Sequence, residues 1–497
     1  QVHLVHQGMD VWSDKAFFYK KENRFEAFDN VRIVQGDSLV LTSKTVNYDG
    51  KIKLAVAKEQ VVLDNKEMLL KTDTLYFDRI KSIAYYPANG TVYDSLTTIN
   101  SKRGTYVSDT KKYKFENKVV VTNPDFTLTS ARMDFYTETK HAFFYGATTI
   151  IGEDYVVRCR EGFYNTDKKE GYFKKNASID YNNRNIIGDS IYFNDTQKYA
   201  SATQNIRITD TINNSFITGN YGQVFKEKDS AMVTHRALAI NLVELDSLFI
   251  HADTLIATGP PEQRIIRGFH DVRIFKEDLS GKTDSIHFNQ TSGRAKLIRR
   301  PISDRDLQYL TPQEIADRNP ILWSDESQMT GDEIHLTIDN EKEVLDSLLI
   351  YNNAFVIEQD SLDAANFNQI KGLQLKGKFK GKSLETVDVI QNTEMVYYLY
   401  DDETQELTGI DKAICSALRL DFVDSGIEKI TFFTNPDGVI YPPKELPENT
   451  RQLLGFTWRE DERIYSKEDL FHGIDLENYS IKVKPGEIKG IPIELKR

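Results

Sequence analysis

The sequence predicts an all-β protein built from stacked repeats of a strand, a turn and a second strand. Three observations carry this prediction. Apolar and polar residues alternate in short runs, as they do in half-buried strands. A small polar residue followed by such a run recurs from Asn89 to Asn205 at steps of 28, 29, 30 and 29 residues. A second marker runs about half a repeat away, as in Asp73-T-L-Y-F and Asp189-S-I-Y-F. About twelve repeats of roughly thirty residues are therefore expected.

The segment from Gly188 to Thr209 shows the repeat most clearly. Asp189 leads into an alternating run, a polar segment turns the chain, a second run follows, and Asn205 precedes a third. We therefore expect Asp189 to lie in a turn before a strand, and Asn205 to open a new strand.

The repeats predict five parts along the chain. Residues 1–25 form an N-terminal lead-in, and residues 26–300 hold the regular array. Residues 301–322 interrupt the array with an inserted loop, in which Thr311, a following proline and Glu314 predict one short helix. Residues 323–455 resume the array. Residues 456–497 form a charged tail that either packs on the body or stays mobile, with a possible short helix at Ser466-K-E-D-L-F.

The composition is ordinary for a folded protein and excludes some functions. The 497 residues are 40% hydrophobic and 11% aromatic, with a mean hydropathy of −0.48. Apolar runs of about eighteen residues are absent, so no membrane-spanning helix is expected. The net charge is −12 without a local basic surplus, which disfavours a nucleic-acid binder. Gln1 at the start fits a processed export signal and a trimmed chain equally well.

Cysteine and histidine usage indicates neither a cofactor nor a metal site. Cys159 and Cys415 are 256 residues apart in different repeats, which favours two buried thiols over a disulfide. His287 and His335 hold equivalent positions in two repeats and are expected to point outward. His3 and His6 are expected at the surface rather than on a metal, because the sequence contains no Cys/His cluster with metal-ligand spacing.

A stripe of large apolar residues should face the interior of the stack, because a single repeat cannot bury its apolar face alone. From the pattern alone, two arrangements stay open: a packed core, which is the commoner one, or a cleft wide enough for alkyl chains. The stripe contains Val46, Tyr48, Leu75, Phe77, Met133, Phe135, Ile191, Phe193, Leu255, Ile286, Phe288, Ile334 and Leu336.

The two markers together resemble those of the OstA-like, or LptA-type, lipopolysaccharide-transport family, over roughly residues 25 to 455. The segments Pro320-I-L-W-S-D-E-S-Q-M-T-G-D, Asn368-Q-I-K-G and Gly455-F-T-W-R are similar to those of its long members. The resemblance implies an elongated β-jelly roll, slightly open along one side, whose apolar stripe holds the acyl chains of lipopolysaccharide. This chain has enough repeats for two such jelly rolls, unlike the short members.

The resemblance also implies a place and partners. A protein of this kind would lie in the periplasm of a Gram-negative bacterium, associated with the outer membrane, and would bind lipopolysaccharide through lipid A. It would dock by strand edges to an outer-membrane assembly barrel and to other jelly-roll bridge proteins, and could associate end to end.

Two other classes compete with transport. One is a structural or docking component of an outer-membrane assembly with a dry packed core. The other is a stacked-β enzyme that degrades polysaccharides, which needs paired carboxylates. Its candidates recur just before strands, where turn residues bonded to backbone amides are the simpler interpretation, and a protein without catalysis is expected. These candidates are Asp73, Asp189, Asp253, Asp284 and Asp332.

Overall fold

The structure is a computed structural model that describes most of the chain. It describes residues 2–473, apart from 7–8, 37–38, 67, 182, 242–246, 300, 325, 340–343, 382, 402 and 424–425. The described chain is almost entirely β-strand, which confirms the predicted fold class. It forms two compact units that divide between Ile206 and Arg207, called unit 1 and unit 2 below. This division falls inside the regular array rather than at residues 301–322, and the five predicted parts stay a prediction.

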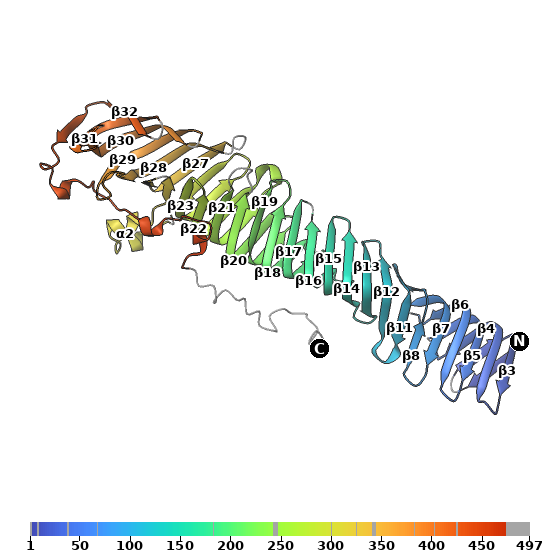
Figure 1. The fold of residues 1–497 in the computed structure, drawn as a ribbon. Helices are drawn as coiled ribbons and strands as arrows, with labels where there is room; N and C mark the ends of the chain where they lie inside the picture. Colours follow the sequence, from blue (N-terminus) through green and yellow to red (C-terminus); the bar gives the residue numbers. More distant parts are fainter. Residues whose placement is uncertain are drawn as a thin grey trace. The chain divides into compact units, whose positions relative to one another are not determined.

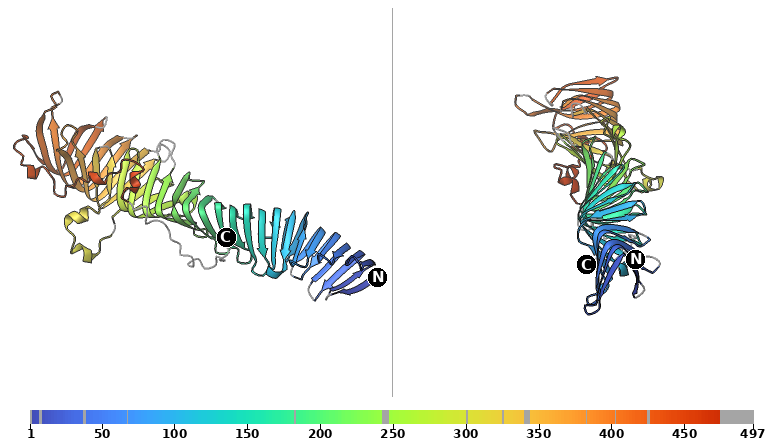
Figure 2. Two further views of the ribbon diagram at one scale, coloured as in Figure 1. Left: turned by 60° about the horizontal axis from the view of Figure 1, so that its bottom comes forward. Right: turned by 90° about the vertical axis from the view of Figure 1, so that its right-hand side faces the viewer.

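Unit 1 is a succession of antiparallel strands, most of which pair with the strand before and the strand after them in the chain, as from β12 to β17. Figures 1 and 2 show these strands following one another in chain order, from blue to green. The strands are β1 (Val2–His6), β2 (Met9–Ser13), β3 (Lys15–Tyr19), β4 (Arg24–Gln35), β5 (Leu39–Asp49), β6 (Leu54–Asp64), β7 (Leu69–Asp78), β8 (Ile83–Tyr86), β9 (Gly90–Asp94), β10 (Thr97–Ser101), β11 (Arg103–Val107), β12 (Lys112–Thr122), β13 (Phe126–Tyr136), β14 (His141–Gly152), β15 (Tyr155–Asn165), β16 (Glu170–Tyr181), β17 (Arg184–Asn194) and β18 (Tyr199–Asp210), which crosses the division.

A corner in the middle of the strands explains the repeat. In β16, Lys175 and Asn176 both have left-handed backbone angles, and the pairing with β17 shifts its register at this point. Such a pair recurs on alternate strands, so one repeat of about thirty residues contains two strands. Asparagine is common at these positions because it adopts the left-handed conformation more readily than most other residues do. The pairs are Asp29 and Asn30, Glu59 and Gln60, Asn117 and Lys118, Lys175 and Asn176, Gln204 and Asn205, His235 and Arg236, His270 and Asp271, Asn352 and Asn353, Gln391 and Asn392, and Thr434 and Asn435.

The positions predicted for the two sequence markers were both wrong, because each marker lies inside a strand. Asn205 does not open a strand but lies at the corner inside β18, and Asp189 lies inside β17 rather than in a turn. The Asp189 carboxylate accepts a hydrogen bond from the side chain of Asn205. The alternating runs on both sides of each corner belong to one bent strand, so the strands are about twice as long as predicted.

The corner divides unit 1 into two arms that face each other. Arm A ends in the turns that follow β5, β7, β11, β13, β15 and β17, and arm B ends in the turns at the opposite strand ends. Aromatic rings from the two arms meet inside: Phe126 of arm B contacts Tyr164 of arm A, with 5.6 Å between ring centroids, and Tyr155 contacts Phe193 at 4.7 Å. The arm A turns recur every 29 residues, each ending on a residue with left-handed angles: Lys53, Ser82, Lys111, Lys140, Lys169 and Lys198.

Two strands of unit 1 are interrupted at the corner. β8 and β9 pair with the two halves of β7, and β10 and β11 pair with the two halves of β12. The Tyr86 ring fills the corner, where its hydroxyl lies 2.6 Å from Ser101 Oγ. A methyl group on Gly90 or Gly104 would lie 2.5 Å or 2.3 Å from this ring, so both positions need glycine.

Unit 2 repeats the same construction, and its strands lengthen towards the end of the chain. β28 to β31 pair successively in antiparallel fashion. The strands are β19 (Ser215–Phe225), β20 (Ser230–Asn241), β21 (Leu248–Thr258), β22 (Ile265–Lys276), β23 (Leu279–Asn289), β24 (Arg294–Ile298), β25 (Ile321–Ser324), β26 (Ser327–Thr330), β27 (Glu333–Asp339), β28 (Val344–Gln359), β29 (Phe367–Lys380), β30 (Ser383–Tyr400), β31 (Leu407–Val423), β32 (Gly426–Phe433) and β33 (Asp437–Tyr441).

The inserted segment between β24 and β25 contains two short helices where one was predicted. α2 (Pro312–Ala316) begins at Thr311 with the predicted capping box, in which Thr311 and Glu314 bond each other's backbone amide. α1 (Asp304–Leu307) was missed. Its cap is Ser303, whose side chain accepts from the amide of Asp306. The sequence signal was present in Ser303 but lacks the glutamate that completes a capping box.

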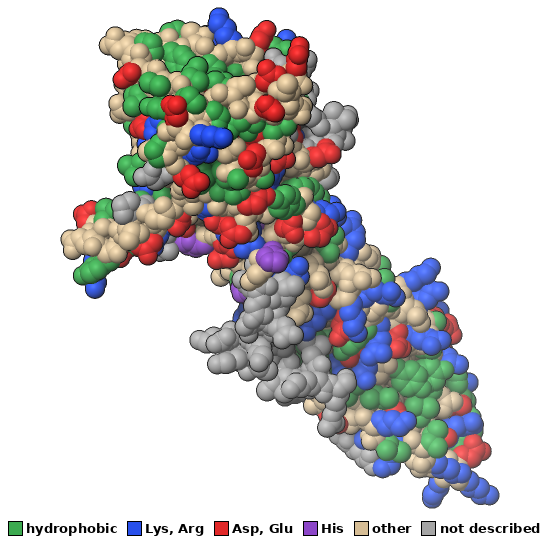
Figure 3. Space-filling view, turned by 60° about the vertical axis from the view of Figure 1, so that its left-hand side comes forward, with side chains coloured by type: hydrophobic (Ala, Val, Ile, Leu, Met, Phe, Trp, Pro, Cys, Tyr) green, Lys and Arg blue, Asp and Glu red, His purple; other side chains and the backbone are tan. Residues whose placement is uncertain are grey.

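Charge is divided unequally between the two units. Residues 1–206 contain 29 Lys and Arg against 26 Asp and Glu, whereas residues 207–497 contain 34 against 49. The space-filling view shows blue side chains over the unit 1 strands in its lower right part (Figure 3). The acidic balance of the whole chain therefore comes from unit 2, and unit 1 does not repel an anionic ligand by its net charge.

The end of the described chain packs along the outside of unit 2. Leu446 and Leu453 are buried against Phe355, Ile357 and Tyr398, and Phe456 and Trp458 pack on the same cluster. This segment, residues 446–472, is called the strap below. The predicted tail therefore packs on unit 2 as far as it is described, and residues 474–497 lie outside the described residues.

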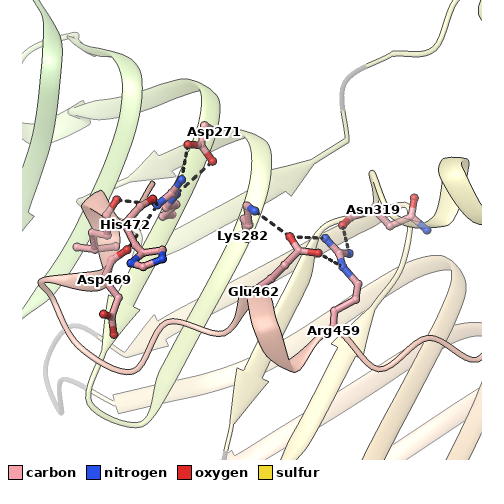
Figure 4. Close-up of polar contacts among 9 residues, drawn as sticks. Asp271, Lys282, Asn319, Arg459, Glu462, Asp469 and His472 are labelled. Atoms are coloured by element: carbon pink, nitrogen blue, oxygen red, sulfur yellow. Dashed lines mark hydrogen bonds and ion pairs between the residues drawn. The ribbon is translucent and has the colours of Figure 1, made fainter. Parts of the chain in front are cut away.

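Polar contacts fix the strap further along (Figure 4). Glu462 accepts hydrogen bonds from Arg459 at 2.6 Å and from Lys282 on β23 at 2.8 Å. Burial would raise the pKa of Glu462, but these bonds and the two positive charges hold it below its usual value. Arg273 on β22 donates to the backbone carbonyls of Leu470 and His472. The predicted helix at Ser466-K-E-D-L-F is a single 3₁₀ turn, Asp469–Phe471.

Candidate functional site

The first strands of unit 1 enclose an apolar cavity of about 580 Å³ between the two arms. A volume of this size is typical of a binding site for a small ligand. Leu4, Val11 and Ile33 contribute from arm B, and Leu75 and Phe77 from arm A. The complete lining is Leu4, Val5, Met9, Val11, Phe18, Asn23, Phe25, Ile33, Gln35, Leu39, Leu41, Val46, Tyr48, Ala55, Leu63, Leu75, Phe77, Arg79, Ser82, Ala84, Tyr106 and Ser108.

Four of the predicted lining residues meet in this cavity. Val46 and Leu75 are almost fully buried in its wall, and Tyr48 and Phe77 are half-buried. They belong to β5 and β7, and the strand between them contributes Ala55. The small alanine side chain, between larger residues on both sides, helps to leave the space open.

Sequence reasoning missed the contribution of the N-terminal lead-in. β1 pairs with β2, and β2 pairs with the arm B half of β4, so these two strands extend the arm B wall. Val5 and Phe18 are 67% and 64% exposed although they line the cavity, so its lining reaches solvent at this end. The alternation in Val2-H-L-V-H was the available signal, but it lies before the first clear repeat.

The interior of unit 1 beyond the cavity is closed and packed. Met133, Phe135, Ile191 and Phe193 are each at most 5% exposed. None of these four lines the cavity described above. Their neighbours fill the space between the arms with aromatic rings, as in the contact of Tyr155 with Phe193. Unit 1 therefore contains both a packed core and an apolar cavity, in different parts, and the binding of alkyl chains in the cavity stays a prediction.

Ion pairs join the tips of the two arms over the packed part of unit 1. Lys140 Nζ, in an arm A turn, lies 2.8 Å from Asp94 Oδ2, in arm B. Lys169 Nζ lies 2.8 Å from Asp125 Oδ2 in the same arrangement. In each pair the arm A residue follows its partner by about one and a half repeats, so the line of contact, called the seam below, runs obliquely across the strands.

The seam of unit 2 is more deeply buried. Arg264 is 2% exposed, and its Nε lies 3.0 Å from Asp210 Oδ2. Burial would raise the pKa of Asp210, but hydrogen bonds from Asn213 and the charge of Arg264 hold it below its usual value. Asn213 also donates to the carbonyl of Pro261 on the other arm. These contacts leave the interior of unit 2 covered on this side.

The remaining predicted lining residues lie in unit 2, in its packed interior. Leu255, Ile286, Phe288, Ile334 and Leu336 are each at most 4% exposed. A small cavity of about 70 Å³ lies further along, between residues such as Leu348 and Val389. It has the volume of a few water molecules and is too small for an alkyl chain of a lipid.

The candidate enzymatic and metal-binding residues are not brought together into one site. Asp73, Asp189, Asp253 and Asp284 lie inside four different strands at their corners, and Asp332 precedes β27. Asp332 accepts a hydrogen bond from Asn353, and Asp284 lies 3.6 Å from His270. The sequence predicted bonds to nearby backbone amides, whereas Asp189, Asp284 and Asp332 contact corner side chains and Asp73 accepts from the hydroxyl of Thr74.

The histidines mostly bond their neighbours. His287 and His335 are half-buried on the outer face, and burial lowers the pKa of His287. His3 stacks on Trp12 and lies 2.9 Å from Asp10, and the side chain of His6 lies outside the described residues. Over the part of the chain that the structure describes, no three metal-ligating side chains gather. Cys159 and Cys415 are buried free thiols, and burial raises the pKa of Cys159 to about 12.

Comparison with known proteins points to one family for the part of the chain that forms the cavity. Residues 1–131 match the family model of the OstA-like protein. The chain is also similar to the crystal structure of LptH from Pseudomonas aeruginosa, described as the LptA-homologous periplasmic component of the lipopolysaccharide transport device. The identity is 15%, over 26% of this chain and 77% of that one, with a TM-score of 0.14. No curated protein matches the chain. None of the described helices has the length and apolar character needed to cross a membrane.

Proposed function

We propose that this protein binds lipopolysaccharide in the periplasm and takes part in its transport to the outer membrane, with acyl chains held in the cavity of unit 1. The observation that carries the proposal is the cavity itself, an apolar space between facing arms that reaches solvent at the N-terminal end. The OstA-like match supports it, because residues 1–131 include every residue that lines the cavity.

Apolar burial alone supplies enough free energy for this role. Transfer of an alkyl chain from water contributes about 0.8 kcal/mol for each buried CH₂ group, so a few chains suffice for stable binding. The ligand then needs no catalytic group or cofactor, and the protein acts as a carrier without enzymatic activity. The packed interior beyond the cavity provides a rigid body for this site rather than further lipid-binding length.

The family resemblance also suggests how the carrier works with others. Among the described strands, β1 pairs with β2 alone and β3 with β4 alone, so each has a free edge that can add a strand of another jelly-roll protein. Other proteins of a bridge to an outer-membrane assembly barrel would then dock at this end, where Val5 and Phe18 are exposed and lipid can pass between the cavity and its neighbour.

The test has two parts. Lipids extracted from the protein purified from its native envelope are identified by mass spectrometry, and stoichiometric lipid A species are expected. Photo-crosslinking residues are then placed at Phe77 in the cavity, at Phe135 and Phe193 in the packed interior, and at Tyr76 on the outer face. Lipid should label position 77 alone.

Other outcomes separate the competing hypotheses. Labelling at Phe135 and Phe193 as strong as at Phe77 would show that the packed interior opens to lipid. A protein that is folded and free of lipid, with no labelling at Phe77, would contradict transport and support a docking component with a dry core.

A further inference from the structure

The rim of the cavity contains one charged residue. Arg79 alone carries a charge among the described residues that line the cavity, and every other lining residue is apolar or neutral. It is half-buried in the turn after β7, on the arm A side. A lone cation at the edge of an apolar space is the arrangement that suits an amphiphile with a negatively charged head.

We propose that Arg79 binds the phosphate of the head group of a lipid whose alkyl chains occupy the cavity. The inference rests on the proposed function and makes it more specific, because it names the residue and the chemical group that distinguish the ligand from other apolar molecules. Guanidinium binds phosphate through two parallel hydrogen bonds, a geometry that an ammonium group cannot provide.

Arg79 is available for this contact. None of the described residues forms an ion pair with it. The nearest carboxylate in the sequence is that of Asp78, which accepts hydrogen bonds from the amides of Ile80 and Lys81 and pairs with the Lys81 ammonium at 3.4 Å. Asp78 is therefore bonded within its own turn and leaves the guanidinium free for an anion from outside.

The rim that presents Arg79 is fixed by backbone hydrogen bonds between successive turns. The amide of Arg79 donates to the carbonyl of Lys53 at 3.1 Å, and that of Ser108 donates to the carbonyl of Ser82 at 3.0 Å. Asn23, Ser82 and Ser108 line the cavity on the same rim and provide neutral donors. A phosphate at this rim would meet one cation and several neutral donors in positions set before binding, which lowers the entropy cost of binding.

The experiment compares two short-chain lipids that differ only in the phosphate. Dihexanoyl phosphatidic acid and dihexanoylglycerol are titrated against the full chain, below their aggregation concentrations, by displacement of a fluorescent fatty-acid analogue. The wild-type protein should bind the phosphatidic acid at least tenfold more tightly. Arg79→Gln should reduce this preference to less than threefold while the affinity for dihexanoylglycerol stays the same.

Arg103→Gln is the matched control. Arg103 begins β11 at the outer corner, is exposed and does not line the cavity. The variant changes the charge of unit 1 by the same amount and should keep the full preference. Inorganic phosphate, titrated alone, distinguishes a head group from a free ion: it should displace no probe at concentrations where the phosphatidic acid is saturating.

The outcomes separate this inference from the proposed function. If the wild type binds both lipids equally, or if Arg79→Gln keeps the preference, the assignment of Arg79 is wrong while the cavity remains a lipid site. If the wild type binds neither lipid, the proposed function fails as well. A loss of preference in Arg103→Gln would show a general charge effect.

Two further measurements guard against an unfolded variant. Arg79→Lys keeps the charge but not the fork of donors, and should retain an intermediate preference. In the wild type, raising the salt concentration should weaken binding of the phosphatidic acid and leave dihexanoylglycerol unaffected. Equal salt dependence for both lipids would overturn the proposal without any substitution.

Discussion

Asn205 Nδ2 donates a 2.8 Å hydrogen bond to Asp189 Oδ2, so the two residues that mark the repeat in the sequence meet at one corner of the fold. Asn30 and Asp14 form the same bond at 2.7 Å, and Asn353 and Asp332 at 3.2 Å. The spacing of the two markers thus reports the distance along the chain between two neighbouring corners. The bond ties one bent strand to the next on the outside of the bend.

Substitution at a corner should separate backbone strain from the loss of this bond. Asn205→Val places a β-branched residue in the left-handed region and should lower the free energy of unfolding by about 1–2 kcal/mol more than Asn205→Gly does. Both variants lose the bond to Asp189, so the difference between them isolates the backbone. Urea unfolding measures it, and equal losses in the two variants would contradict a strained corner.

The filled corner at Tyr86 predicts a steric effect. Gly104→Ala would place a methyl group 2.3 Å from the Tyr86 ring, and the forced shift should cost about 1–3 kcal/mol of unfolding free energy. In a Tyr86→Leu background the same change should cost less, because the ring is gone. Gly377→Ala, whose added methyl has its nearest neighbour at 3.3 Å, is the control with a small expected loss. Additive costs at Gly104 and Tyr86 would argue against the contact.

The strap should loosen in acid through Glu462. Its pKa is lower in the folded protein than its usual value of about 4.5, so the stabilisation is complete above that value and is lost as the pH falls through the lowered pKa. Hydrogen-exchange protection of residues 460–472, corrected for intrinsic rates, should therefore fall below about pH 4.5. In Glu462→Gln the protection should already be lower at pH 7 and should change less with pH.

Glu468→Gln is the control for the strap. Glu468 is on the same segment but its side chain is 71% exposed, and its substitution should leave protection unchanged. A wild-type strap whose protection does not change between pH 7 and pH 3 would show that the apolar cluster around Trp458 holds it without help from Glu462.

The fold class could be predicted from the sequence because the repeat places the same residue types at the same structural positions many times. The corner could not. An asparagine before an alternating run is typical both of a turn that starts a strand and of a bend inside one. Only the pairing of β16 with β17, which continues on both sides of Lys175 and Asn176, decides between them. The residue before the asparagine, which shares its left-handed angles, varies from aspartate to lysine, glutamine and threonine.

The inward stripe was also predictable, but not the cavity. Val46 and Leu75 hold the same places in the repeat as Met133 and Ile191, yet the first two line an open space and the last two a packed one. The difference comes from residues on the facing arm: Leu39 begins β5 in the cavity, where Tyr155 begins the equivalent strand β15 and closes the gap further along. Which arm residues face each other depends on the oblique seam, which no local pattern encodes. Arg79 was missed for a different reason: it lies in the turn after β7, outside the alternating runs from which the inward residues were predicted.

The 29-residue spacing of the arm A turns from Lys53 to Lys198 restricts how such a chain can change its length. If a single strand were removed, every later turn of arm A would lie at the arm B end, and every later turn of arm B at the arm A end. Each left-handed corner pair would also move from its own strand position to that of the neighbouring strand, which has no such pair. Removing or duplicating two strands together preserves both. Length in this architecture is therefore gained or lost in pairs of strands, so a chain of this design can be extended without redesign of the cavity at its first strands.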